Sequence, residues 1–283
     1  MLQARTRRRM PLVMPTTVHI RRSYSECRYG QLHMTTAYPS GGGFDERTPL
    51  VCLHPMGSSS HYFAPGLPEL GRDRSVYAFD IPGFGGSDAP TGEVTLSDLA
   101  TMIGEFVDSL RLRQVDVLGL QLGALLAIEL AAAKPQLVRR LIVGSVPHFT
   151  AQEARAPEWT SLSPLPVEDG SHLLKEWQRL QHSRGVLMTP EQLTEELADT
   201  LRGRRCQAAM LRALLDYPTA KQLALLRQPG LVLRPRDEFY EQSLRARHSY
   251  PQSLLEELPE SGSNVFAHQP QHLLQRIRQF LDV

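Results

Sequence analysis

The sequence has no apolar run long enough to cross a membrane, and it carries almost no net charge. A membrane-spanning helix needs about 20 consecutive apolar residues, and no such run occurs in the 283 residues. The formal net charge of +1 gives no sign of the basic surface with which proteins bind nucleic acid. We therefore expect neither a membrane segment nor a nucleic-acid partner.

Cysteine is also scarce. The chain has Cys27, Cys52 and Cys206, an odd number at wide spacing, with no Cys-x-x-Cys motif and no Cys/His cluster. This pattern argues against a disulfide framework and against a structural metal. Because it is typical of a reducing compartment, we expect a cytoplasmic protein that uses no metal and no cofactor.

What the sequence does contain is an alternation of short apolar runs and helical segments. Residues 50–53, 76–79 and 115–118 are apolar runs typical of buried strands, while residues 96–110 repeat apolar side chains at helical spacing. Strands that alternate with helices predict a mostly parallel sheet with right-handed crossovers. The fold class is therefore α/β.

A tight turn in this pattern carries an unexpected residue. Residues 119–123 read Gly-Leu-Gln-Leu-Gly, between a buried strand and the Ala/Leu-rich helical stretch 124–133. Strand, glycine-flanked turn and helix form the setting of a nucleophile elbow, in which the central side chain projects above the sheet. Here that residue is Gln121, whose amide accepts and donates hydrogen bonds but supplies no nucleophile.

Two further segments extend the pattern. Residues 54–57 read His-Pro-Met-Gly and residues 80–88 read Asp-Ile-Pro-Gly-Phe-Gly-Gly-Ser-Asp, each directly after an apolar strand. In this order they resemble the α/β-hydrolase fold, in the branch that holds epoxide hydrolases, haloperoxidases and C–C bond hydrolases. The resemblance covers residues 45–147 strongly and residues 228–283 more loosely. It implies a mostly parallel sheet flanked by helices, with a helical cap inserted after the sixth strand.

The resemblance also assigns an oxyanion hole. It implies that the main-chain N–H groups of Met56 and Leu122 form the two donors, and both survive the loss of the nucleophile. We therefore expect a ligand carbonyl or carboxylate oxygen to bind there. For His54 two interpretations stay open: direct contact with the ligand, or a structural role in bracing the turn.

The remaining positions of a Ser-His-Asp mechanism are incomplete. The resemblance implies that Asp237, after the apolar strand 230–235, holds the position of the acid. Ser263 stands near the position where the family has its histidine, and neither His268 nor His272 has the expected spacing. Loss of both nucleophile and base removes the covalent route.

The segment between the two halves of the core differs in composition. We divide the chain into a flexible basic arm (1–15), an α/β core (16–148 and 222–283) and the helical cap (149–221). The cap is rich in Glu, Arg, Gln and Leu and predicts helices over residues 171–180, 190–201 and 206–215. Trp177 is its candidate for lining a substrate pocket, with core packing as the alternative.

Three functions remain open on these observations. The first is binding of a small carbonyl- or carboxylate-containing molecule. The second is a noncovalent hydrolase or lyase in which His54 or His148 acts as a base and Gln121 orients the reacting group. The third is a scaffold or interaction protein without enzymatic activity. The sequence does not determine the oligomeric state.

Overall fold

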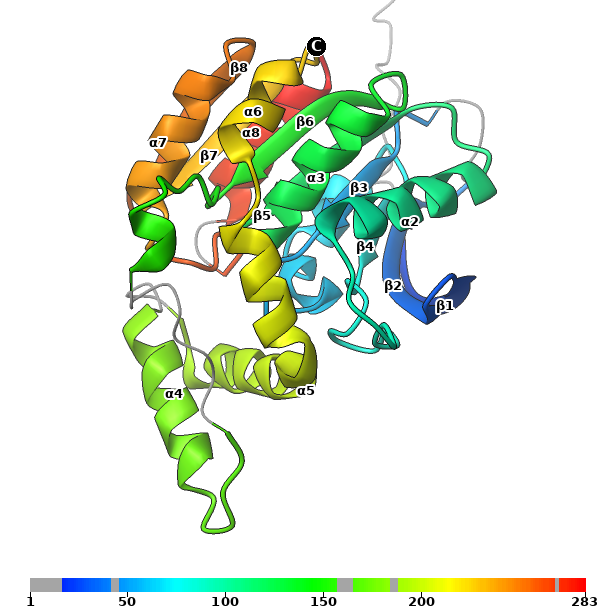
Figure 1. The fold of residues 1–283 in the computed structure, drawn as a ribbon. Coiled ribbons are helices and arrows are strands. Elements are labelled where there is room, and N and C mark those ends of the chain that lie inside the picture. Colours follow the sequence, from blue (N-terminus) through cyan, green and yellow to red (C-terminus); the bar gives the residue numbers. More distant parts are fainter. Residues whose placement is uncertain (1–16, 42–45, 157–164, 184–187, 268–269) are drawn as a thin grey trace, which may run out of the picture.

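The sheet of this protein has eight strands. In the computed structural model, residues 17–41, 46–156, 165–183, 188–267 and 270–283 are described, so the predicted arm 1–15 lies outside them. The strands are arranged in the order β1-β2-β4-β3-β5-β6-β7-β8 (Figure 1). Their bounds are β1 (Val18–Cys27), β2 (Gly30–Pro39), β3 (Leu50–Leu53), β4 (Val76–Phe79), β5 (Val115–Leu120), β6 (Val138–Gly144), β7 (Gly230–Pro235) and β8 (Ser253–Leu258).

Strand direction follows the lengths of the connections. β1 and β2 form an antiparallel hairpin, and β2 also pairs antiparallel with β4. Every other neighbouring pair is parallel, because helical crossovers join those strands. The α/β class and the mostly parallel sheet predicted from the sequence are confirmed.

Helices cover both faces of the sheet and enclose an apolar core on each side. One face carries α2, α3, α6 and α7, and the other carries α1 and α8 (Figure 1). The central strands β3, β5 and β7 are buried along their whole length, as expected for parallel strands covered on both faces. The helices are α1 (Leu67–Leu70), α2 (Leu96–Ser109), α3 (Leu122–Ala133), α6 (Thr219–Leu225), α7 (Tyr240–Ser249) and α8 (Pro270–Leu281), with short 3₁₀ turns at Ser60–Phe63 and Glu153–Arg155.

The cap follows the sixth strand, as predicted, and consists of α4 (Ser171–Ser183) and α5 (Pro190–Leu215). The two helices project from one end of the sheet (Figure 1). The prediction of two helices over 190–215 was wrong, because α5 is continuous through Gly203. A Cβ atom at Gly203 would lie 2.2 Å from the Phe84 ring. This glycine therefore allows close packing of the cap on the core and does not end the helix.

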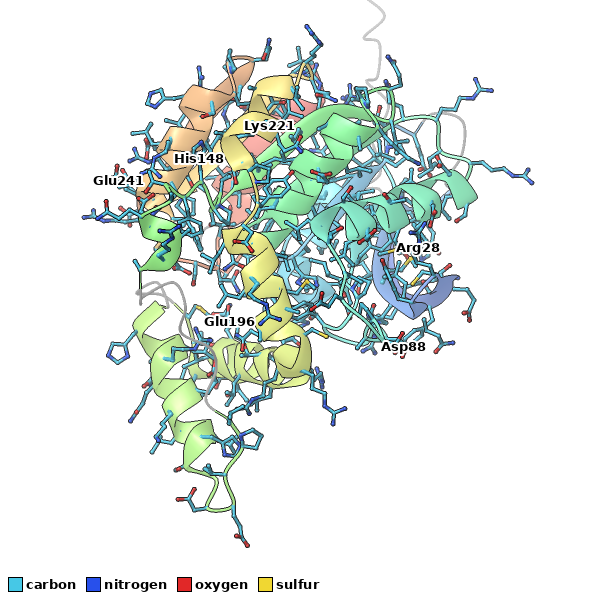
Figure 2. All side chains as sticks on the ribbon, in the orientation of Figure 1. Arg28, Asp88, His148, Glu196, Lys221 and Glu241 are labelled. Atoms are coloured by element: carbon cyan, nitrogen blue, oxygen red, sulfur yellow. The ribbon has the colours of Figure 1, made fainter. Side chains whose placement is uncertain are left out.

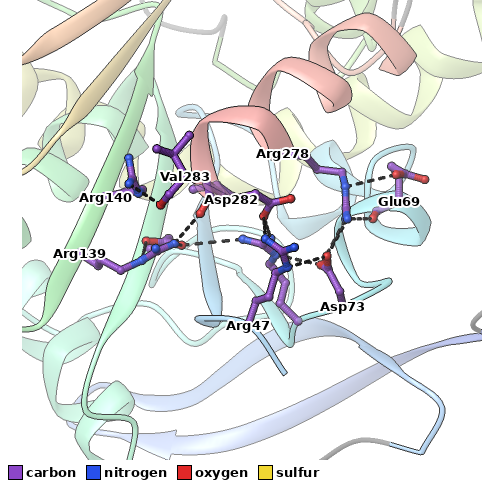
Figure 3. A network of polar contacts seen from close by, with 11 residues as sticks. Arg47, Glu69, Asp73, Arg139, Arg140, Arg278, Asp282 and Val283 are labelled. Carbon is purple, nitrogen blue, oxygen red and sulfur yellow. Dashed lines mark hydrogen bonds and ion pairs between the residues drawn. The ribbon is translucent and has the colours of Figure 1, made fainter. Parts of the chain in front are cut away.

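A network of ion pairs surrounds the end of the chain (Figure 3), and the C-terminus lies at the opposite end of the sheet from the cap (Figure 1). At its centre Arg74 is completely buried and lies beside Asp73, Asp282 and the equally buried Asp116. Arg139 binds Asp116 through two hydrogen bonds of 3.0 and 2.7 Å. These charges join the amino ends of β4, β5 and β6 to the end of α8.

None of the described helices is both long enough and apolar enough to cross a membrane.

Candidate functional site

Gln121 lies at the tip of the turn between β5 and α3, where its backbone is strained. Its φ is 50° and its ψ is −110°, a combination that an L-residue adopts only when its surroundings impose it. Its N–H donates to the carbonyl of Gly144 on β6 at 3.0 Å. A Cβ atom on Gly123 would lie 2.1 Å from the carbonyl oxygen of Leu53, so the turn admits only glycine there. This geometry holds the side chain of residue 121 above the strand ends.

The amide oxygen of Gln121 takes up both main-chain donors expected to form the oxyanion hole. Its Oε1 accepts from the N–H of Met56 at 2.7 Å and lies 3.4 Å from the nitrogen of Leu122. The two N–H groups do converge on one oxygen, but that oxygen belongs to the chain itself. Because two donors face this position, the amide nitrogen must point away from them. Within the described residues, Nε2 has no hydrogen-bond partner and is available at the cavity wall.

His54 is fully buried and has both ring nitrogens occupied. Its Nδ1 lies 2.7 Å from the carbonyl oxygen of Pro55, and its Nε2 accepts from the N–H of Ile81 at 2.9 Å. Donation from one nitrogen and acceptance at the other require a neutral ring, and burial lowers the pKa of His54. The side chain braces the turn, which is the structural alternative that the sequence left open.

His148 follows β6 and is hydrogen-bonded to α7. Its Nε2 lies 3.0 Å from the hydroxyl of Ser249 on α7, and burial lowers its pKa. Figure 2 shows His148 beside α7 and Glu196 on the cap helix α5. Among the described residues that line the cavity next to Gln121, His148 is absent. The structure thus does not bring His54, His148 and Gln121 to one site.

Asp237, at the expected position of the acid, does line this cavity. One of its carboxylate oxygens accepts from the hydroxyl of Ser145, and the other accepts from the N–H of Phe239 at 2.9 Å. Burial raises the pKa of Asp237 to about 7, and the nearby charge of Glu238 acts in the same direction. Ser145, with a φ of 49°, therefore holds the carboxylate that a histidine holds in a complete triad.

Ser263, which the sequence places near the expected position of the histidine, also lines the cavity. The N–H of Arg236 donates to the carbonyl of Ser261 at 2.9 Å, so the loop that carries Asp237 lies against the loop that carries Ser263. His272 is exposed on α8, and His268 lies outside the described residues.

The cavity between the strand ends and the cap has a volume of about 730 Å³. Trp177, half-buried on α4, is not among the described residues that line it. The wall combines polar and charged side chains, among them Gln121, His182 and Asp237, with apolar ones. The apolar side chains are Met56, Phe149, Leu180, Leu211, Leu214, Leu215 and Phe239. Within the described part of the chain, no group of three His, Cys, Asp or Glu side chains is placed to hold a metal ion.

The cap helix α5 is hydrogen-bonded directly to the floor of the cavity. The hydroxyl of Thr200 donates to the carbonyl of Gly57 at 3.2 Å, and Ser59 donates to the carboxylate of Asp199 at 2.5 Å. About one turn earlier on the same helix, Glu196 accepts from Asn264 at 2.8 Å. The loop after β3 and the loop before α8 are thus both tied to the cap.

Sequence reasoning missed Ser145, although a signal for it was present. It directly follows the apolar strand β6, in the same relation that Gln121 has to β5. Residues at the carboxyl ends of parallel strands face one crevice. Applied to every strand, this rule selects Ser145 as well as Gln121. The cap residues Glu196 and Arg179, which also line the cavity, had no such signal.

The raised pKa of Asp237 predicts that folding stability depends on pH. The ordinary pKa of an aspartate in an unfolded chain is about 3.9, so the folded protein retains a proton that the unfolded chain releases. This contribution is fully present below about pH 4 and is lost as the pH rises to about 7. We expect the fall in the free energy of unfolding between pH 4.5 and pH 7.5 to be smaller in Asp237→Asn than in wild type by roughly 1–3 kcal/mol. Urea unfolding at these two pH values measures the difference. Equal pH dependence in both proteins would contradict the assignment.

The fold and the elbow are those of an α/β hydrolase, and the comparisons with known proteins agree. The sequence profile of the Alpha/beta hydrolase family matches residues 50–274. The chain therefore belongs to this family.

Individual relatives are more distant. A poly(3-hydroxyalkanoate) depolymerase of Ectopseudomonas oleovorans is 28% identical over 195 residues, which cover 68% of this chain and 68% of the depolymerase. A 1-acylglycerol-3-phosphate O-acyltransferase of Rattus norvegicus is 35% identical over 126 residues, which cover 40% of this chain and 35% of that protein. The crystal structure of a hydrolase from Pseudomonas aeruginosa superposes with a TM-score of 0.75 at 22% identity, over 93% of this chain and 98% of that one. At this identity the structural likeness shows the fold alone.

Proposed function

We propose that this α/β hydrolase family member binds a small, partly apolar molecule with a carbonyl or carboxylate group, without forming a covalent intermediate. The observation that carries the proposal is the Gln121 amide, whose oxygen fills the main-chain donor pair. The acceptor oxygen of the ligand takes its hydrogen bonds from Nε2 of Gln121. The apolar body of the ligand lies along the leucine and phenylalanine side chains of the cavity.

The hydrogen bonds of the cavity floor support binding over covalent catalysis. Gln121 is held by Met56 and Leu122, and Asp237 is held by Ser145 and Phe239. No nucleophile stands at the elbow, and the hydrogen bonds of the Asp237 carboxylate go to Ser145 and Phe239 and not to His182, the one histidine among the described residues of the cavity wall. A cavity of about 730 Å³ among the described residues supports a ligand over the scaffold alternative.

Two substitutions at Gln121 have different expected effects on binding. Gln121→Glu keeps an oxygen at the N–H groups of Met56 and Leu122 but replaces the free NH₂ by a second acceptor. We expect medium-chain carboxylates to bind about tenfold or more weakly, because the loss of a charge-assisted hydrogen bond costs roughly 1.5–3 kcal/mol. Gln121→Ala uncovers the main-chain donors, so we expect affinity to be kept or increased.

Isothermal titration calorimetry with hexanoate, methyl hexanoate and hexanol distinguishes these cases. Hexanol is the control for apolar contact, and its binding is expected to change least among the variants. Similar affinity of wild type, Gln121→Glu and Gln121→Ala for hexanoate would rule out the amide as the binding group.

Noncovalent hydrolysis is a second candidate, and Asp237 is the observation that favours it. Its pKa of about 7 suits a general base at neutral pH, and it shares a cavity with Gln121. Chromogenic esters and lactones test this function in wild type, Asp237→Asn and Gln121→Ala. Turnover above the blank that falls in Asp237→Asn supports an enzyme, whereas turnover equal in all three proteins excludes one that uses this cavity.

A further inference from the structure

The strand β1 forms one margin of the sheet and is accessible along its whole length. It pairs with β2 on one side only, and all ten of its residues are exposed or half-exposed. Figure 1 shows it at the edge of the molecule that lies furthest from β8. In an antiparallel pair, half of the main-chain N–H and C=O groups point away from the partner strand. On β1 these groups face outward.

Side chains on β1 carry charges of both signs. Arg21 stacks on Tyr38, whereas Arg22 and Glu26 form no hydrogen bond or ion pair with a side chain of the described residues. Arginine on an edge strand commonly repels other strands. Glu26 is the only acidic residue of β1, and it lies four positions after Arg22, on the same face of the sheet.

Symmetry restricts how a second copy can pair with this strand. A two-fold axis perpendicular to the sheet relates each face of one copy to the same face of the other copy. Even-numbered and odd-numbered side chains of β1 lie on different faces, so two residues directly opposite each other must both be even-numbered or both be odd-numbered. A pairing centred on Arg22 places two arginines opposite each other. A pairing centred on Ser23 places Arg22 opposite Tyr24 and forms no ion pair. A pairing centred on Tyr24 places Arg22 opposite Glu26, and it does so twice.

We propose that two copies of this chain associate through antiparallel pairing of their β1 strands, centred on Tyr24. The two sheets then form one continuous sheet, with main-chain hydrogen bonds between the strands. Two Arg22–Glu26 ion pairs flank a Tyr24–Tyr24 contact, and such cross-strand pairs select the register. The Tyr24 side chain is 58% exposed and rests on the ring of His33. This inference is independent of the ligand proposed for the cavity.

Charge exchange provides the first test. Arg22→Glu places two acidic side chains opposite each other, and Glu26→Arg places two arginines opposite each other. We expect each to raise the dissociation constant of the dimer about tenfold or more, because like charges in contact repel, while the double variant restores dimerisation. Sedimentation velocity over a range of concentrations measures this, with circular dichroism as the control for folding. The proposal would be overturned if the wild type were a monomer at all concentrations, or if the double variant dimerised no more tightly than the single variants.

Disulfide trapping tests the register directly, in chains that also carry Cys27→Ser. The Cα atoms of directly opposed residues lie about 4.5–5.5 Å apart, within reach of a disulfide, so Tyr24→Cys is expected to cross-link two copies. Ser23→Cys is the matched control, because its two copies are offset by about 7 Å along the strands. Cross-linking at position 23 that equals or exceeds that at position 24 would contradict the register.

Discussion

A chain that carries both Gln121→Ser and Ser263→His is expected to hydrolyse p-nitrophenyl esters, whereas neither single variant is expected to do so. Gln121→Ser places a hydroxyl at the strained tip of the elbow and removes the amide from the N–H groups of Met56 and Leu122. The oxyanion donors then become available to a tetrahedral intermediate. Ser263→His supplies the general base on the loop that is hydrogen-bonded to the loop of Asp237.

The expected gain is large because a positioned general base contributes about 10²- to 10⁴-fold in rate. We expect initial rates in the double variant to exceed those of Gln121→Ser by a factor in this range. Adding Ser145→Ala frees Asp237 from its present hydrogen bond and is expected to increase the rate further, while adding Asp237→Asn decreases it. A double variant as slow as Gln121→Ser would show that Ser263 does not hold the position of the histidine.

Replacement of Arg74 by methionine is expected to cost about 3–5 kcal/mol in the free energy of unfolding. Its side chain is completely buried and lies beside three carboxylates, one of which, Asp116, is also fully buried. Without the Arg74 guanidinium, the negative charges of these carboxylates are only partly balanced by the remaining arginines. Arg139 still binds Asp116, and Arg47 still binds Asp282 (Figure 3).

Arg72→Met is the matched control for this prediction. Arg72 pairs with Glu69 at 3.0 Å, but its side chain is 53% exposed. Exposed ion pairs contribute only about 0–1 kcal/mol, so we expect a change of that size. Urea unfolding of the two variants measures the difference, and equal losses would show that burial of Arg74 adds nothing to its contribution.

Sequence patterns predicted the fold, because it depends on main-chain geometry, and of the predicted site residues Gln121, Met56 and Asp237 line the cavity. The glycine-flanked turn at Gln121 follows from the pattern of strand, turn and helix, whereas the donors of Met56 and Leu122 were implied by the resemblance to the α/β-hydrolase fold. The direction of the Gln121 amide does not follow from this pattern, because a side-chain rotamer depends on which groups surround it in three dimensions. For the same reason, strand order predicted that His148 lies near the end of a strand, but it did not predict the direction in which the ring points.

The helix α5 shows the same limit. Its interior glycine, Gly203, lies in the gap between the two predicted helices and has a low helical propensity. The ring of Phe84, more than 100 positions earlier in the chain, packs where a side chain would otherwise lie. Such a contact between distant segments is visible only in the folded protein.

The bond between Thr200 and Gly57 gives the cap a mechanical link to the elbow. One peptide segment donates through Met56 to Gln121 and accepts through Gly57 from α5. A displacement of the amide that moves this segment must therefore stretch or break the bond to Thr200, or carry α5 with it. Binding of a molecule against Gln121 and the position of α5 above the cavity therefore depend on each other. A probe on α5 reports on what lies against Gln121.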